Sequence, residues 1–179
     1  MISNNNWHVV TGGPSSGKTT LVDEMAKLGY ATCPEPARTY IDRQIATGKT
    51  LPEISRDMAK YQNEILKTAL EIRESAPKNK IVFFDRSVCD LTAYNEFYGL
   101  DASEPRRRCG EIRYGKIFFL EQLEFTPDYA RVEDRETARK LSAAIKKVYR
   151  GLGYEIISLP PAPLAERVKT VLKEISAGN

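Results

Sequence analysis

Short runs of apolar residues recur along the chain, and most of them stop abruptly at glycine, proline or an acidic residue. Short apolar runs that are bounded in this way are typical of buried strands. Two of them, KIVFFD and KIFFLE, are solid apolar blocks of the kind found in the middle of a parallel sheet. The sequence predicts five strands, over residues 7–12, 30–33, 80–85, 116–121 and 154–160.

Between these runs, apolar positions recur at steps of three and four, which is the period of an amphipathic helix. The pattern predicts helices over residues 18–29, 37–46, 52–76, 133–151 and 164–175. Strands that alternate with helical crossovers indicate an α/β fold, so we expect one domain over residues 1–179 with a five-stranded parallel sheet flanked by helices. Ligands of such sheets bind beyond the carboxyl ends of the strands, where Glu35, Asp85 and Glu121 fall.

Composition narrows the function classes. The chain is 41% hydrophobic and 28% charged, and its net charge of +3 is too small to indicate a nucleic-acid partner. No apolar run approaches the roughly 18 residues of a membrane span. Three scattered cysteines indicate a reducing, cytoplasmic location and inert side chains, without a disulfide or zinc spacing. We expect the triplet at 106–108, RRR, to be a solvated helix face, and the lone His8 to be structural.

The stretch GGPSSGKTT joins the first predicted strand to the first predicted helix. It matches G-x-x-x-x-G-K-[ST] in the context that a phosphate-binding loop needs, because curled glycines point backbone N–H groups at phosphate oxygens. We expect Lys18 to stand exposed and reach the outer phosphates of ATP, and Thr19 to ligate Mg²⁺. The alternative is a glycine-rich turn capped by a lysine. The predicted nucleotide-binding residues of this loop are Gly12, Gly13, Pro14, Ser15, Ser16, Gly17, Lys18, Thr19 and Thr20.

Asp85 ends the third predicted strand and should face the phosphate loop. An acidic residue at that point is placed to hold Mg²⁺ directly or through water. Aspartate also suits the N-cap of a helix, although Ser87 could fill that role instead.

Two further motifs follow the second and third strands. The first is PEPARTY, which contains E-P-x-R, and the second is FFDRSVCD, which contains D-R-S. Together with the phosphate loop they resemble the deoxyribonucleoside-kinase branch of the P-loop kinases. In length, and in the phrase GGPSSGKTTL, the chain is more similar to the NadR-like AAA-type ATPase domain family, which includes nicotinamide riboside kinase domains. The resemblance covers about residues 9–172.

The resemblance implies roles for particular residues. Glu35, held between two prolines, would be the general base, with Lys18 and Arg86 completing the catalytic set. Arg38 would join Glu35 and Arg86 on the substrate, although Glu35 and Arg38 could instead pair only with each other. Gln62 would bind the base of the substrate, or else a neighbouring backbone carbonyl. The residue before Arg86 is Asp, where many deoxyribonucleoside kinases carry Glu. An Asp at this position resembles the usage of nucleotide kinases.

The segment YARVEDRETARK predicts an arginine lid at about residues 125–140. Arg131, Arg135 and Arg139 are four residues apart and would share one face of a helix. In P-loop kinases such a segment closes over ATP, so Arg131 and Arg135 are further predicted nucleotide ligands. The alternative is surface pairing with the acidic residues at 133, 134 and 136.

Two functions compete at this stage. The first is an ATP-dependent kinase that transfers the γ-phosphate to a nucleoside-like hydroxyl, with Mg²⁺ as cofactor. The alternative is a regulatory ATP- or GTP-binding protein with slow NTPase activity. The expected partners of the protein are a nucleoside triphosphate and a small-molecule acceptor, and the protein would be a monomer or a homodimer.

Overall fold

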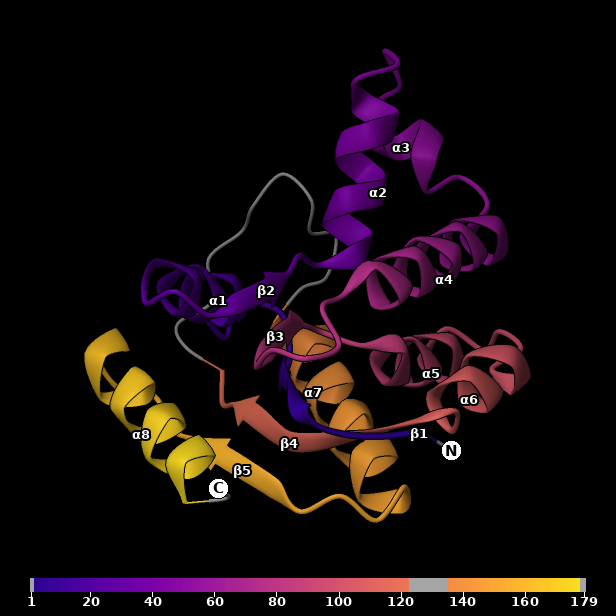
Figure 1. The fold of residues 1–179 in the computed structure, drawn as a ribbon. Helices are drawn as coiled ribbons and strands as arrows, with labels where there is room; N and C mark the ends of the chain where they lie inside the picture. The colour runs from indigo at the N-terminus through magenta and orange to yellow at the C-terminus, as the bar shows by residue number, and fades with distance from the viewer. Residues whose placement is uncertain (1, 123–134, 178–179) are drawn as a thin grey trace.

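The computed structural model describes residues 2–122 and 135–177, built around a five-stranded parallel sheet (Figure 1). The strand order is β2-β3-β1-β4-β5. The strands are β1 (Ile2–Thr11), β2 (Ala31–Cys33), β3 (Val82–Asp85), β4 (Ile112–Leu120) and β5 (Ile156–Leu159). The helices are α1 (Lys18–Lys27), α2 (Pro36–Ile45), α3 (Leu51–Ile54), α4 (Met58–Ser75), α5 (Val88–Phe97), α6 (Ser103–Cys109), α7 (Arg135–Gly151) and α8 (Leu164–Ser176).

The predicted parallel sheet is confirmed, and β1 lies at its centre. Its two neighbours, β3 and β4, are the strands of the two solid apolar blocks. Val10 stands opposite Asp85 on one side and Phe118 on the other. The loop that leaves β1 therefore emerges between the carboxyl ends of β3 and β4.

The two faces of the sheet are covered by different helices (Figure 1). Successive residues of a strand point to opposite faces. Val9 packs into a core with residues of α4, α5 and α7, whereas Val10 packs with residues of α1 and α8. Both faces are thus buried, which explains the continuous apolar runs of the central strands. Helix α2 rises from the end of β2, with α3 beside its far end.

The prediction of one helix over residues 52–76 is wrong, because two helices occupy this stretch. Thr50 and Glu53 form a capping box that starts α3. Asp57 then accepts a hydrogen bond from the backbone N–H of Lys60 at 3.0 Å and starts α4. Each cap satisfies N–H groups at a helix start, so a second start is favoured within the amphipathic pattern.

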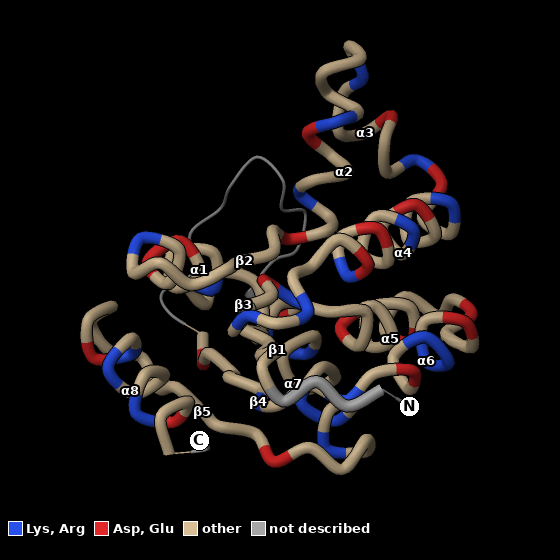
Figure 2. Tube along the Cα trace, viewed as in Figure 1, with Lys and Arg blue, Asp and Glu red and all other residues tan. Residues whose placement is uncertain are grey.

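Helices α5 and α6 are not among the helices predicted from the apolar pattern, although a helix face was expected at the arginine triplet. Helix α6 carries the arginine triplet, whose side chains pair with Glu96, Glu104 and Glu111. Blue and red positions accordingly lie together around α6 (Figure 2). The expected solvated helix face is confirmed. Among the described helices, none combines the length and the apolar character that crossing a membrane requires.

The expectation that all three cysteines are inert and unpaired is wrong. Cys89, in the first turn of α5, forms a disulfide with Cys109 at the end of α6, and their Cα atoms are 5.0 Å apart. The packing of two unpredicted helices creates this proximity across a sequence separation of 20 residues. Cys33 is a buried free cysteine. The disulfide removes the argument from cysteine content for a reducing compartment.

Candidate active site

A cavity opens at the carboxyl edge of the sheet, between the phosphate loop and helices α2, α4 and α5. Its lining contains all four predicted acceptor-side residues and five of the predicted phosphate-loop residues, which come from segments far apart in the sequence, whereas Asp85 is not part of the lining. The residues that line it include Pro14, Gly17, Lys18, Thr19, Thr20, Glu35, Arg38, Ile41, Met58, Tyr61, Gln62, Ile65, Arg86, Asp90, Leu91, Tyr94 and Tyr98.

The phosphate loop curls tightly at two glycines. Gly12 has φ 143°, and a Cβ there would lie 2.4 Å from the carbonyl oxygen of Leu120. Gly17 has φ 83° and is the N-cap of α1. A side chain would clash at the first position and strain the backbone at the second, so glycine is required at both. The loop delivers the positive end of α1 to the cavity.

Lys18 is buried, with only 5% of its surface exposed, so the expectation of an exposed lysine is wrong. Its Nζ donates to the carbonyl oxygen of Gly13 at 2.8 Å and to Oγ of Ser16 at 3.3 Å. Burial, followed by the charge of Arg86, lowers the pKa of Lys18 to about 7. An anion bound in the loop would oppose this shift by stabilising the protonated amine.

Thr19 and Asp85 face each other at the start of α1 and the end of β3. The Thr19 hydroxyl donates to Oδ2 of Asp85 at 2.7 Å, while buried Oδ1 has no partner among the described residues. Burial, followed by the nearby Glu35 charge, raises the pKa of Asp85 to about 6. A carboxylate oxygen without a partner beside a hydroxyl fits Mg²⁺, which needs few protein ligands. Ser87, and not Asp85, is the N-cap of α5.

Glu35 is the N-cap residue of α2, and Arg86 holds its side chain. Nε of Arg86 donates to Oε1 of Glu35 at 2.9 Å, whereas Nε of Arg38 lies 3.8 Å from Oε2. Glu35 is therefore not paired with Arg38 alone. Burial by itself would raise the pKa of Glu35, but the charges of Arg86 and Lys18 hold that pKa below its usual value. The carboxyl group is consequently ionised at neutral pH.

Arg86 is itself fixed on several sides. Its backbone adopts φ 67°, a left-handed conformation that is uncommon for arginine. Its Nη1 donates to the carbonyl oxygen of Gly12 at 3.0 Å and to Asp90 at 3.2 Å, and its guanidinium lies 5.4 Å from the centre of the Tyr94 ring. These contacts join Glu35 to the phosphate loop through one buried side chain.

Asp90 holds Arg86 at this site and, like Met58 and the tyrosines of the cavity, was not predicted from the sequence as a site residue. It is 1% exposed and accepts hydrogen bonds from the Thr11 hydroxyl, from the backbone N–H of Ser87 at 3.0 Å, and from the Tyr149 hydroxyl at 2.6 Å. The spacing S-x-x-D at Ser87–Asp90 is a capping-box signature and was the available signal. Its second role, holding Arg86, arises only from tertiary packing.

The far end of the cavity, between α4 and α5, is lined by aromatic and apolar side chains around one amide. Gln62 is 4% exposed, and its Oε1 has no partner among the described residues. Its Nε2 contacts Sδ of Met58 at 3.9 Å, and Tyr61 and Tyr98 also line this end. A buried amide oxygen without a donor is unfavourable, so the site is suited to a ligand with an N–H or O–H group.

The arginine lid can be followed only in part. Arg131 lies outside the described residues, as does the side chain of Arg135, which begins α7. Arg139 is exposed on α7, and Glu136 pairs with Lys140 at 2.6 Å. The lid at about residues 125–140 stays a prediction.

A family model described as an AAA domain matches residues 7–167 of the chain. A comparison with curated proteins gives no match. Among solved structures, the NadR protein bound to NAD and AMP-PNP is 19% identical with a TM-score of 0.70, covering 95% of this chain and 49% of that chain. This chain therefore spans about half the length of that NadR protein.

Two kinases of similar size share the fold. Deoxyadenosine kinase from M. mycoides has a TM-score of 0.68 at 12% identity, covering 97% of this chain and 100% of that one. Thymidylate kinase from Ehrlichia chaffeensis has a TM-score of 0.69 at 15% identity, covering 95% of this chain and 97% of that one. The chain thus has the fold of P-loop nucleoside and nucleotide kinases and, by the match over residues 7–167, belongs to this AAA-domain family.

Proposed function

We propose that this protein is a kinase that transfers the γ-phosphate of ATP to the hydroxyl of a small, nucleoside-like acceptor. One observation carries the proposal. The ionised carboxylate of Glu35, which Arg86 holds in place, lies in the same cavity as the phosphate loop and as an end that is lined by tyrosine rings and the Gln62 amide. A protein that only binds or hydrolyses a nucleotide has no need of the second end.

The donor side is formed by the phosphate loop. Backbone N–H groups at the start of α1 would bind the phosphates of ATP, and Lys18 would exchange its contacts within the loop for phosphate oxygens. Thr19 and Asp85 would hold Mg²⁺, which when bound neutralises charge on the β- and γ-phosphates. The low exposure of Lys18 and Asp85 limits the access of water.

The acceptor side extends from Glu35 to Gln62. The tyrosines and Met58 offer flat apolar surface to a ring, and Gln62 offers an acceptor and a donor to its edge. A nucleoside has both a ring with polar edge groups and a sugar hydroxyl. The acceptor named in the related deoxyadenosine kinase is of this class.

Glu35 would then act on the acceptor hydroxyl. The carboxylate takes the hydroxyl proton while the acceptor oxygen bonds to the γ-phosphorus and the bond from γ-phosphorus to the bridging oxygen breaks, leaving ADP. Because Arg86 fixes Glu35, the carboxylate is positioned before the acceptor binds, and positioning is the main contribution of protein groups to phosphoryl transfer.

The test measures ADP release from Mg-ATP across a panel of nucleosides, nicotinamide riboside and nucleoside monophosphates, with a reaction lacking any acceptor as control. We expect at least one unphosphorylated nucleoside to raise ADP release well above the control and to yield its phosphorylated product. A slow basal release that no acceptor stimulates would instead support the regulatory NTPase.

A further inference from the structure

A second buried arginine contacts the phosphate loop, although it lies far from the loop in the sequence. Arg167 lies in the first turn of α8, and only 4% of its surface is exposed. Its Nη1 donates to the carbonyl oxygen of Ser16 at 2.7 Å, its Nε to that of Pro160 at 3.0 Å, and its Nη2 to that of Glu121 at 3.4 Å. One guanidinium thus joins the loop after β1 to the ends of β4 and β5.

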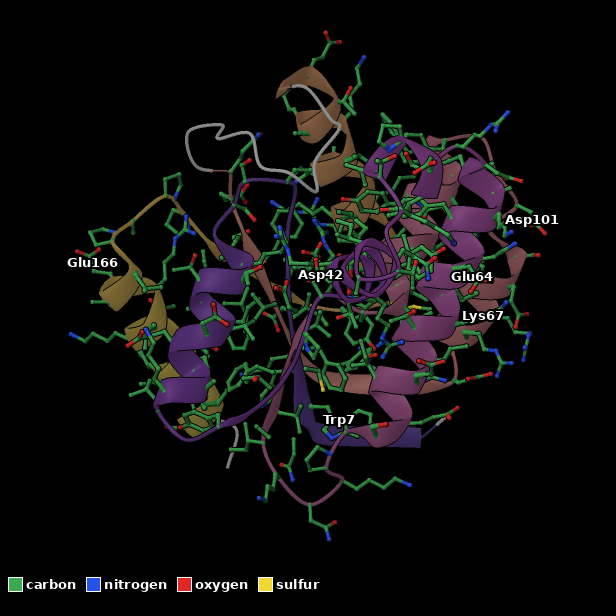
Figure 3. The ribbon with its side chains drawn as sticks, turned by 90° about the horizontal axis from the view of Figure 1, so that it is seen from above. Trp7, Asp42, Glu64, Lys67, Asp101 and Glu166 are labelled. Atoms are coloured by element: carbon green, nitrogen blue, oxygen red, sulfur yellow. A yellow bond between two sulfur atoms is a disulfide. The ribbon has the colours of Figure 1, made fainter. Side chains whose placement is uncertain are left out.

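This position is unfavourable for a cation in two ways. The start of a helix carries partial positive charge, which repels a guanidinium in the first turn. Burial also removes the side chain from water, and its three hydrogen bonds go to neutral carbonyl groups. The preceding residue, Glu166, is exposed on the outer side of α8 (Figure 3). A cation kept inside despite these effects points to a role at the loop.

The peptide group that Arg167 contacts also belongs to the cavity. The bond between Ser16 and Gly17 is trans, so the carbonyl of Ser16 and the N–H of Gly17 point in opposite directions. Arg167 lies on the carbonyl side, whereas Gly17 lines the cavity. A charged donor on the carbonyl polarises the whole peptide group and makes its N–H a stronger hydrogen-bond donor.

We propose that Arg167 is a positioning residue for the phosphates of the bound nucleotide, acting through the Ser16–Gly17 peptide group. It holds this peptide in place from behind and strengthens the Gly17 N–H that faces the phosphates. The inference rests on the nucleotide-binding part of the proposed function and is independent of the acceptor.

The test uses Arg167→Gln and Arg167→Lys, with Arg113→Gln as the matched control. Arg113 also donates to two backbone carbonyls, those of Leu152 and Gly153, both at 2.7 Å. These contacts lie at the amino ends of β4 and β5, away from the phosphate loop. Binding of Mg-ADP and of inorganic tripolyphosphate is measured by calorimetry. We expect Arg167→Gln to weaken both by about tenfold and Arg167→Lys to weaken both by about threefold. Arg113→Gln should leave both unchanged.

A purely structural role would be distinguished by the amide resonances of the ADP complex. We expect the Gly17 amide proton to shift upfield in Arg167→Lys, with the Thr19 amide nearly unmoved. Unchanged affinities for both ligands, or equal shifts throughout the loop, would overturn the proposal. Tripolyphosphate binding separates the two proposals. If the unaltered protein binds tripolyphosphate and Arg167→Gln binds it about tenfold more weakly, this inference is supported even where no acceptor is phosphorylated. If the unaltered protein binds neither probe, both proposals fail.

Discussion

Single residues at the cavity carry buried charge. Lys18, Asp85 and Arg86 are 5%, 1% and 8% exposed. Removing a charge from water costs several kcal/mol unless a partner of opposite sign compensates. Part of that compensation comes from neighbouring side chains, and a bound nucleotide with its metal would supply the rest. The site is therefore more strained electrostatically when empty than when occupied.

This argument gives a prediction for Lys18→Met, which keeps the length of the side chain and removes its charge. Because burial already disfavours the protonated amine, we expect the melting temperature to stay level or rise. Mg-ATP affinity should fall by at least about 100-fold, the loss expected for a charged phosphate contact. Lys27→Met is the control, since Lys27 is exposed on the same helix and pairs with Glu24. Calorimetry and thermal melts report both quantities, and a large loss of stability would contradict the reasoning.

At the scale of elements, α5 and α7 meet through a buried polar network beneath the site. The hydroxyl of Tyr149 on α7 lies 2.8 Å from Oγ of Ser87 and donates to Asp90 at 2.6 Å. Asp90 in turn holds Arg86, which holds Glu35. A hydroxyl on one helix thus supports a carboxylate on another, with two side chains between them.

We predict that Tyr149→Phe lowers kcat for acceptor phosphorylation about three- to tenfold and leaves the KM for ATP nearly unchanged. Asp90 loses one hydrogen bond, so Arg86 and Glu35 are less well fixed, while the phosphate loop is untouched. Tyr154→Phe is the control, because its hydroxyl is also buried but bonds to the backbone N–H of Tyr114. Equal effects of the two variants on kcat would argue against a specific network.

The disulfide between Cys89 and Cys109 should stabilise the pair α5 and α6. Closing a loop of 20 residues restricts the unfolded chain and contributes about 3 kcal/mol. We therefore expect a reductant to lower the melting temperature of the unaltered protein by several degrees. The variant Cys89→Ala/Cys109→Ala should melt at the lower temperature with or without reductant. A reductant-insensitive melting temperature in the unaltered protein would contradict this expectation.

Some elements of the fold could be predicted from the sequence and others could not. The phosphate loop and the central strands were predictable, because local glycine spacing and apolar runs determine them. Helix α5 was not, because it is buried on nearly every side and has no polar face to set a period. The roles of Asp90 and Arg167 depend on contacts between distant segments, which single-sequence patterns do not encode. Glu35 and Arg86 could be paired in advance only through the resemblance to known kinases.

At the scale of the whole molecule, one buried histidine links the fold to pH. His8 is 4% exposed, its ring contacts those of Phe83 and Phe118, and its Nδ1 has no partner among the described residues. Burial, followed by the charge of Lys116, lowers the pKa of His8 from 6.5 to about 4. The expectation that His8 is structural agrees with this core position.

The unfolded chain takes up a proton at His8 below pH 6.5, whereas the folded protein does so only near pH 4. The free energy of unfolding should therefore fall as pH decreases through this window, by up to about 3 kcal/mol from this residue. In His8→Phe this part of the pH dependence should disappear. Urea unfolding of both proteins at several pH values measures it as the difference between their free energies of unfolding, with pH 7–8 as the reference range, because Lys18 contributes equally to both proteins there and the difference should not change with pH. Parallel curves would contradict the assignment.

The central claim is that Glu35 is the base for transfer to an acceptor, and ADP release by Glu35→Gln tests it most directly. Rates are measured with and without the acceptor identified in the panel. Glu111→Gln is the control, since Glu111 pairs with Arg73 at 2.8 Å outside the cavity. We predict that Glu35→Gln binds ATP normally and loses about 10²- to 10⁴-fold in acceptor-stimulated rate, while Glu111→Gln retains it. Equal stimulated rates in Glu35→Gln and the unaltered protein would contradict the account.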